Sequence, residues 1–174
     1  MQLLLAPQIV EHLRRELGRA GKREIGGLLM GEHLHDEIFR VIEISVQRSG
    51  GSHACFVRNP KKHQDKLQKF FARTDENYVR FNYLGEWHSH PSFEPAPSST
   101  DIQTMQSIVD DPDVGVNFLV LLIARLSNGK KLEVTAMAFR AGAPPVAISV
   151  SPETDSQVQS ESIAHPWLRK IFRF

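Results

Sequence analysis

The sequence predicts a single α/β domain, and three observations support this prediction. Segments with helical periodicity alternate along the chain with short apolar segments typical of strands. An Asn128-Gly129 pair separates two of these apolar segments, which is a strong signal for a β-hairpin. The chain has 174 residues, a length that suits one domain with a substantial core.

The first expected elements are a short strand at residues 2–6 and a helix that begins at Pro7, where the missing N–H of proline costs little. Gly21 is a typical residue at the end of such a helix. Residues 25–30 and 37–47 are expected to form strands, because both segments are largely apolar. The apolar face of the helix consists of Ile9, Leu13, Leu17 and Ala20.

Two further helices are expected over residues 60–75 and 99–110, and Ser99 is the expected cap of the second. The lysines of the first of these helices form a basic stripe, which is either a solvated helix face or a docking surface for an acidic partner. These lysines are Lys61, Lys62, Lys66 and Lys69. The remaining expected strands are 54–57, 83–90, 118–126, 132–139 and, as an edge strand, 146–150.

The composition excludes several classes of protein. The 21 basic and 20 acidic residues give a formal net charge of +1, so no basic excess indicates nucleic-acid binding. One cysteine excludes an internal disulfide framework and a Cys-rich zinc site, so a metal site would have to use carboxylates and some of the eight histidines. The longest apolar run, residues 118–124, is far shorter than the ~20 residues of a membrane span, and no signal peptide is evident. We therefore expect a cytoplasmic protein.

The most informative stretch is Gly85–Asp101, which reads GEWHSHPSFEPAPSSTD. His88 and His90 are two residues apart on an expected strand, so both side chains point to one face with Cα atoms about 6.7 Å apart. Pro91 ends the strand, and the chain returns to a helix whose first turn contains Asp101. Two imidazoles, one carboxylate and a water would form the open four-coordinate site of a catalytic zinc ion.

Two other patterns in the sequence compete with this interpretation. His33 and His35 also form a His-x-His pair, but no Ser-x-x-Asp follows them at the same spacing, and we expect both at the surface. Cys55 allows a Cys–His protease as an alternative, because His53 would face the same side of a short strand. A lone cysteine in an apolar segment is more often a small buried hydrophobe.

The residues His88-Ser89-His90-Pro91, Ser98 and Asp101 resemble the JAMM (MPN+) motif of zinc metalloproteases. A second block, Glu24 to Gly31, resembles the other signature of that family, a glutamate followed by a glycine-containing apolar strand. The resemblance covers roughly residues 2–150 and is strongest to the compact bacterial JAB peptidases. It implies a cytidine-deaminase-like α/β fold, with a curved mixed sheet flanked by helices.

The resemblance also assigns roles to five residues. His88, His90 and Asp101 would be the ligands of one zinc ion per chain. Glu24 would be the general base, which takes a proton from the zinc-bound water and later delivers it to the leaving amine. Ser98 would hydrogen-bond the water or the developing oxyanion.

The implied reaction is hydrolysis of an isopeptide or peptide bond after the C-terminal glycine of a ubiquitin-like modifier. The compact bacterial relatives often accompany activating and conjugating enzymes in antiviral-defence operons. The expected partners are therefore the modifier, its conjugates and those enzymes, with no nucleic acid and no membrane. The alternatives are a JAMM hydrolase for a sulfur-carrier protein or a peptide, and a non-catalytic MPN scaffold. Substrate-binding residues are not assigned, although Phe93 and Pro95 are candidates.

The expected domain organisation is a JAB/MPN+ domain over residues 1–150, followed by a polar linker and a C-terminal tail within residues 151–174. The tail carries Arg169, Lys170 and Arg173 but no acidic residue after the linker. It is expected either to pack on the domain or to bind a partner or a second copy of the chain.

Overall fold

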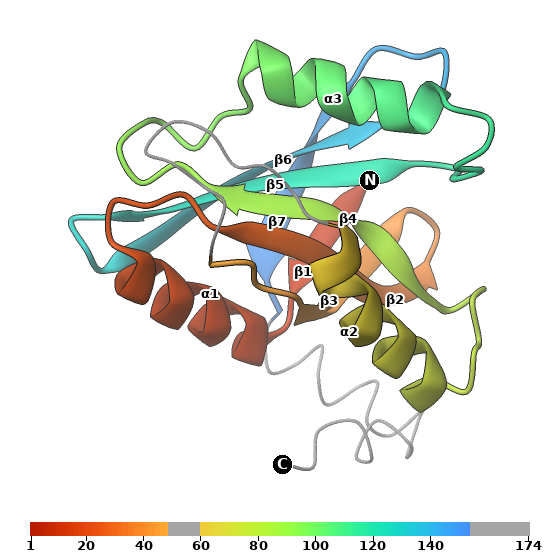
Figure 1. Cartoon of the computed structure of the whole chain (residues 1–174), viewed down its shortest axis with the longest axis horizontal. Helices are drawn as coiled ribbons and strands as arrows, with labels where there is room; N and C mark the ends of the chain where they lie inside the picture. Colours follow the sequence, from red (N-terminus) through yellow and green to blue (C-terminus); the bar gives the residue numbers. More distant parts are fainter. Residues whose placement is uncertain (49–59, 154–174) are drawn as a thin grey trace.

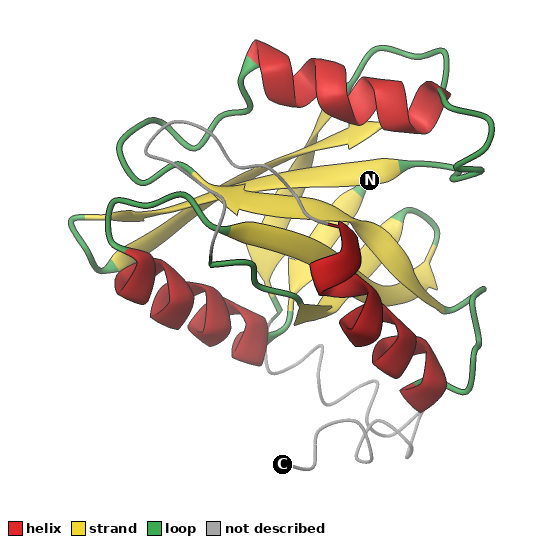
Figure 2. Cartoon of the chain, in the orientation of Figure 1, coloured by secondary structure: helices red, strands yellow, loops and turns green. Residues whose placement is uncertain are grey.

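The computed structural model describes residues 1–48 and 60–153 of the chain. The strands in this part are β1 (Gln2–Leu5), β2 (Gly26–His35), β3 (Ile38–Ile44), β4 (Phe81–Ser89), β5 (Leu119–Ser127), β6 (Lys131–Phe139) and β7 (Val146–Pro152). The helices are α1 (Pro7–Ala20), α2 (Pro60–Arg73) and α3 (Ser99–Asp110). All strands belong to one sheet, in the order β1-β3-β2-β4-β5-β6-β7 (Figure 1). In the view of Figure 2, α3 lies above the strands and α1 and α2 lie below them.

The sheet is mixed, and it closes into a barrel because β7 pairs with both β6 and β1. The pairs β4–β5, β1–β3 and β1–β7 are parallel, whereas the other neighbours are antiparallel. The interpretation of residues 146–150 as an edge strand is therefore wrong. Strand periodicity reports the two faces of a strand, but it carries no information on whether the sheet curves far enough to meet its own first strand.

Apolar side chains on both faces of β5 explain why this strand is a continuous apolar run. One face packs with α1, and the other face packs with α3. The α1 face consists of Val120, Leu122 and Ala124 in β5 together with Ile9, Leu13 and Leu17 in the helix. The α3 face consists of Leu119, Leu121 and Ile123 in β5 together with Met105 and Val109 in the helix. Among the described residues, no helix combines the length and apolar character needed to cross a membrane.

The expected elements that lie in the described residues are present, with some shifted ends. The predicted Asn128-Gly129 turn joins β5 to β6, and both residues have a positive φ, 52° and 68°. The first helix ends at Gly21, as predicted, with a φ of 61°. The expected strand 54–57 and Cys55 lie outside the described residues, as does the chain beyond residue 153.

The basic stripe of the second helix is partly explained by packing. Lys66 donates a hydrogen bond to the carbonyl oxygen of Ile44 at 2.6 Å, and its ammonium lies 3.6 Å from the carboxylate of Glu43. Lys66 therefore helps to hold α2 against the end of β3. Lys69 is exposed, so a role for it in binding an acidic partner stays a prediction.

A buried ionic cluster lies where β7 meets the rest of the barrel. Arg40 in β3 donates to the carboxylate of Glu32 in β2 at 3.2 Å and also pairs with Glu153, the residue after β7. Arg80 donates to the second oxygen of Glu32 at 2.6 Å. Glu153 is only 8% exposed, so this cluster holds the end of β7 against β3.

Gly27 in β2 allows the residue after β3, Ser45, to lie directly against β2. A Cβ atom at this position would lie 2.1 Å from the carbonyl oxygen of Ser45, the residue after β3. Ser45 in turn accepts two hydrogen bonds at this point, on its hydroxyl from the backbone N–H of Leu28 at 2.8 Å and on its carbonyl from the indole of Trp87 at 2.9 Å. Only glycine leaves space for this close approach.

We predict that Gly27→Ala lowers the free energy of unfolding by about 1–3 kcal/mol, because the added methyl group must displace backbone. The matched control is Gly18→Ala in α1, where the nearest atom to the added methyl group is 4.0 Å away. That change should stabilise the helix by up to about 1 kcal/mol. Chemical denaturation followed by circular dichroism measures both effects, and equal stability of the Gly27→Ala and wild-type proteins would contradict the prediction.

Candidate metal centre

Three side chains from separate positions in the chain meet at the carboxyl end of β4. His88 lies in β4, His90 directly follows it, and Asp101 lies in the first turn of α3. The two Nε2 atoms are 3.1 Å apart. The Asp101 carboxylate lies 3.4 Å from Nε2 of His88 and 3.8 Å from Nε2 of His90. One ligand atom from each residue thus lies within 4.8 Å of the others, which suits a single metal ion.

The alternation of β4 explains why both histidines face the same side. Trp87 and Ser89 point to the other face and are completely buried. The backbone N–H of His90 donates to the carbonyl oxygen of Ala124 in β5 at 3.0 Å. This bond continues the β4–β5 pairing by one residue, so His90 is held in the strand direction although β4 ends at Ser89.

Asp101 is held by a capping box at the start of α3. The N-cap is Ser98, whose hydroxyl accepts from the backbone N–H of Asp101 at 3.2 Å. In return, the Asp101 carboxylate accepts from the backbone N–H of Ser98 at 2.7 Å and from its hydroxyl at 2.6 Å. The prediction that Ser99 caps this helix is therefore wrong, because the reciprocal bonds with Asp101 at N3 require the serine three residues before it.

These contacts also determine the charge of Asp101. Burial disfavours the carboxylate, but hydrogen bonds from His88 and Ser98 outweigh burial and hold the pKa of Asp101 far below its ordinary value. Asp101 is therefore ionised at neutral pH, which is the form that binds a metal cation.

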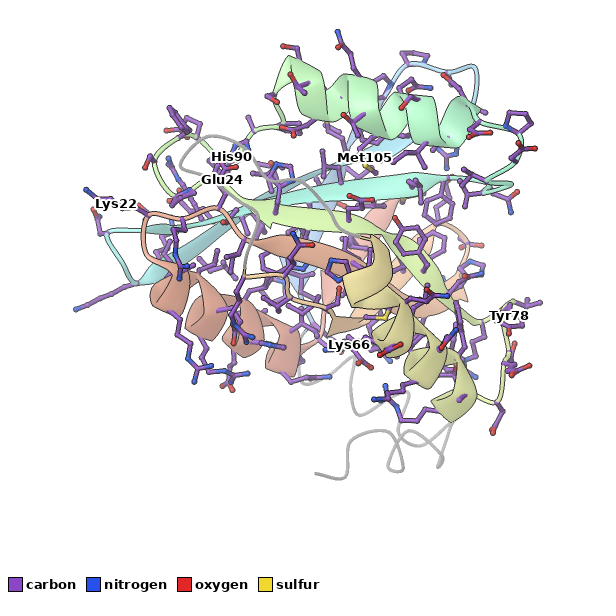
Figure 3. The ribbon with its side chains drawn as sticks, viewed as in Figure 1. Lys22, Glu24, Lys66, Tyr78, His90 and Met105 are labelled. Atoms are coloured by element: carbon purple, nitrogen blue, oxygen red, sulfur yellow. The ribbon has the colours of Figure 1, made fainter. Side chains whose placement is uncertain are left out.

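Glu24 lies close to His90, two residues before β2 (Figure 3). Two hydrogen bonds join the start of β2 to the end of β4: Ile25 N–H donates to the hydroxyl of Ser89 at 3.0 Å, and Ser89 N–H donates to the carbonyl of Ile25 at 2.8 Å. Gly26 pairs with His88 in the ladder. This register brings Glu24, distant in sequence, to the histidines.

Glu24 is buried, with 4% of its surface exposed. Burial raises the pKa of Glu24, and the Asp101 carboxylate adds to the increase, whereas positive charge on His90 or His88 would lower it. A carboxylate with a raised pKa is a stronger base than an exposed glutamate. Glu24 is therefore not an exposed carboxylate at the junction between α1 and β2.

The second histidine pair lies apart from the candidate site. The ring of His33 stacks on Phe39 with 4.8 Å between ring centroids, and its Nε2 bonds to the carbonyl of Asp36 at 2.8 Å. His35 is exposed and lies 3.6 Å from the Asp36 carboxylate. Among the described residues, the metal-ligand cluster is formed by His88, His90 and Asp101 rather than by this pair.

A cavity of about 210 Å³ lies close to the candidate site but on the opposite face of β4. Its lining includes Ser89 and Pro91, which alternate with the two histidines, and Gly18 and Gly21 at the end of α1. Because the ligand atoms point to the other face, this cavity is not where the predicted chemistry would occur.

Several residues that support the site have no sequence signal. Ser89 stands between the two histidines, where any small residue would serve as a spacer, yet its hydroxyl fixes the start of β2. Arg125 and Thr135 on the β5–β6 hairpin contact the loop between His90 and Ser98. Their sequence separation from that loop, 32 and 40 residues, is too large for a local pattern to reveal the contacts.

The family comparison identifies the class of this protein as a JAB-domain protein. The chain belongs to the family described as prokaryotic homologs of the JAB domain, whose model matches residues 6–141. A solution structure of a Desulfitobacterium hafniense protein has a TM-score of 0.65 and 18% identity, covers 89% of this chain and 94% of its own, and supports the fold.

Two curated relatives are both named CD-NTase/cGAS isopeptidase. The protein from Enterobacter hormaechei subsp. hoffmannii is 26% identical over 161 residues, which cover 92% of this chain and 81% of that protein. The protein from Vibrio cholerae serotype O1 is 34% identical over 105 residues, which cover 59% of this chain and 62% of that protein. The chain is therefore similar to most of the first relative and to less than two thirds of the second.

We predict that Ser98→Ala lowers the free energy of unfolding of the metal-free protein by about 1 kcal/mol, because it removes the N-cap. Ser99→Ala is the matched control and should change stability much less, since Ser99 lies inside the helix. Urea denaturation of the two variants in the presence of a chelator makes the comparison. A larger loss for Ser99→Ala would contradict the capping box.

Proposed function

We propose that the protein is a zinc-dependent isopeptidase that cleaves after the C-terminal glycine of a ubiquitin-like modifier. The observation that carries the proposal is the convergence of His88, His90 and Asp101 on one point, with the buried Glu24 beside them. Family membership and the isopeptidase names of the two relatives support a peptidase. The mixed sheet with helices on both faces supports the cytidine-deaminase-like fold.

The donor set fits a catalytic zinc ion. Two imidazole nitrogens and one ionised carboxylate are ligands that zinc favours, and three protein ligands leave a position for water or substrate. His88, His90 and Asp101 would hold the ion. When bound, zinc lowers the pKa of a coordinated water and polarises the carbonyl group of the scissile bond.

Glu24 is the proposed general base and acid. Its carboxylate accepts a proton from the attacking water, and the resulting carboxylic acid donates that proton to the nitrogen of the leaving amine. Burial suits both steps, because the raised pKa favours protonation of the carboxylate and the low exposure keeps bulk water away from the proton.

Ser98 has two proposed roles that compete for one proton. Its hydroxyl donates to the Asp101 carboxylate at 2.6 Å, which orients Asp101 toward the histidines. Donation to the developing oxyanion, the role implied by the family resemblance, requires the hydroxyl to exchange that bond for one to the substrate.

The proposed substrates are isopeptide conjugates of a ubiquitin-like modifier, and the relatives' names make a CD-NTase the first candidate target. Activating and conjugating enzymes of an antiviral-defence system are then proposed partners, in the bacterial cytoplasm. Phe93, in the loop between His90 and Ser98, is 56% exposed and is a proposed apolar contact for the substrate.

We predict that the purified protein binds about one zinc ion per chain and that His88→Ala and Asp101→Asn each abolish this binding. Loss of one of three ligands leaves too few donors for a stable site. His35→Ala, in the exposed histidine pair, is the matched control and should retain wild-type zinc content. Elemental analysis after dialysis against buffered zinc measures all four proteins, and zinc bound equally by His88→Ala would contradict the proposed ligand set.

We predict that Glu24→Gln keeps its zinc but lowers kcat by about 10²–10⁴-fold, the usual contribution of a general base. The substrate is a modifier fused through its C-terminal glycine to a second protein, and cleavage is followed by electrophoresis. Glu86→Gln provides the control, because Glu86 is a half-buried carboxylate in β4 that bonds to the Tyr83 hydroxyl at 3.4 Å.

The outcomes of this assay separate the proposed enzyme from its alternatives. A zinc-loaded wild-type protein that cleaves no modifier fusion but hydrolyses a sulfur-carrier precursor or a short peptide would replace the proposed substrate. A Glu24→Gln protein with full biological function in the producing cell would favour a non-catalytic scaffold.

A further inference from the structure

We propose that Arg125 is a positioning residue for the metal centre, which acts by holding the loop at residues 91–97 and, through that loop, the ring of His90. The inference rests on the proposed function, because it assigns a role to Arg125 in the same site. It adds a residue from the β5–β6 hairpin to a centre built otherwise from β2, β4 and α3.

The guanidinium of Arg125 joins the hairpin to the loop through three groups. Nε donates to Glu133 in β6 at 2.8 Å. One terminal nitrogen donates to the carbonyl oxygen of Phe93 at 2.9 Å, and the other lies 3.1 Å from the carboxylate of Glu94. Each of the three guanidinium nitrogens thus has a defined partner, a geometry that an arginine provides and a lysine does not.

The ion pair with Glu133 fixes the direction of the arginine. Arg125 and Glu133 are direct partners in the antiparallel β5–β6 ladder, so their side chains share one face of the hairpin. The Arg125 side chain is 22% exposed and that of Glu133 is 25% exposed, so both are largely covered. A hydrogen bond from Arg125 lowers the pKa of Glu133, which keeps the partner charged.

Glu94, whose carboxylate pairs with Arg125 and which follows the Phe93 carbonyl held by Arg125, carries the group that orients His90. The carbonyl oxygen of Glu94 lies 3.3 Å from Nδ1 of His90. Because a carbonyl oxygen can only accept, this contact assigns the proton of the neutral ring to Nδ1. Nε2 then presents its lone pair toward His88 and Asp101, as metal binding requires.

A second contact holds the same loop against the hairpin. Thr135 in β6 donates from its hydroxyl to the carbonyl oxygen of Pro95. Within the loop, the backbone N–H of Ala96 donates to the carbonyl oxygen of Glu94 at 2.8 Å. The segment between the ligands His90 and Asp101 is therefore attached to β5 and β6 at successive residues, which restricts the distance between those two ligands.

The contacts of Arg125 distinguish positioning from catalysis. Its donors contact Glu133, Phe93 and Glu94 rather than a proposed ligand or Glu24. Arg125 would therefore change the metal site only through the loop. Groups that hydrogen-bond a metal-ligating histidine directly typically contribute about 10–100-fold to metal affinity or activity. Arg125 acts one step further from the metal, through the loop, so we expect an effect at the low end of this range.

The test compares Arg125→Ala and Arg125→Lys with the control Arg140→Ala. Arg140 is also a partly exposed arginine that pairs with a glutamate, Glu37. It directly follows β6, at the end of the β5–β6 ladder opposite to Arg125. Zinc dissociation constants are measured by competition with a chromogenic chelator. We expect about 10-fold weaker binding for Arg125→Ala, partial recovery for Arg125→Lys, and no change for Arg140→Ala.

A second readout reports the His90 ring itself. Long-range ¹H–¹⁵N spectra of the metal-free protein should show the Nδ1–H tautomer of His90 in the wild type and a mixture of tautomers in Arg125→Ala. A general loss of stability would not change this tautomer in a protein that remains folded. Should Arg125→Ala fail to fold, Arg125→Lys and Thr135→Val are measured by the same titration, and each is expected to weaken zinc binding.

Zinc affinity within twofold of the wild type in these variants, together with an unchanged His90 tautomer, would overturn the role of Arg125 and leave the proposed function intact. Failure of the wild-type protein itself to bind zinc would instead overturn the proposed function, and this inference with it.

Discussion

The pairing of β2 with β4 is the constraint on which the candidate site depends. Gly26 lies opposite His88, and two hydrogen bonds between Ile25 and Ser89 lock this register at the end where the strands meet the site. A shift of this register by one residue would turn the histidines into the core and Trp87 outward. The large aromatic side chain of Trp87 would then lose its burial. The hydrophobic core and the site therefore depend on the same register.

The site places two carboxyl groups close to two histidines, an arrangement with an electrostatic cost. Burial of Glu24 disfavours its charged form, and the nearby Asp101 carboxylate disfavours it further. Asp101 is stabilised by hydrogen bonds from Ser98 and His88, whereas the ionised form of Glu24 is favoured by positive charge on the histidines. A bound cation would offset this cost, which is the expected property of a site organised around a metal.

Much of the fold follows from local patterns, and so does part of the site. Helical periodicity predicts α1 up to Gly21, and the Asn128-Gly129 turn predicts the hairpin. The spacing of His88 and His90 predicts their common face because alternation is a property of any strand. The sequence predicts Ser99 as the cap of α3 instead of Ser98, because local sequence does not distinguish adjacent serines, and only the reciprocal bonds with Asp101 do.

By itself, the sequence determined which residue types can bind a metal, which of them share a face, and which family their spacing resembles. The tertiary structure alone decided that Glu24 is buried beside the histidines, that β7 closes the barrel, and that Arg125 holds the loop between the ligands. The physical reason is the difference in the sequence distance over which these effects act. Periodicity and capping act over a few residues, whereas these contacts depend on strand register and sheet curvature, which are fixed only when the whole core packs.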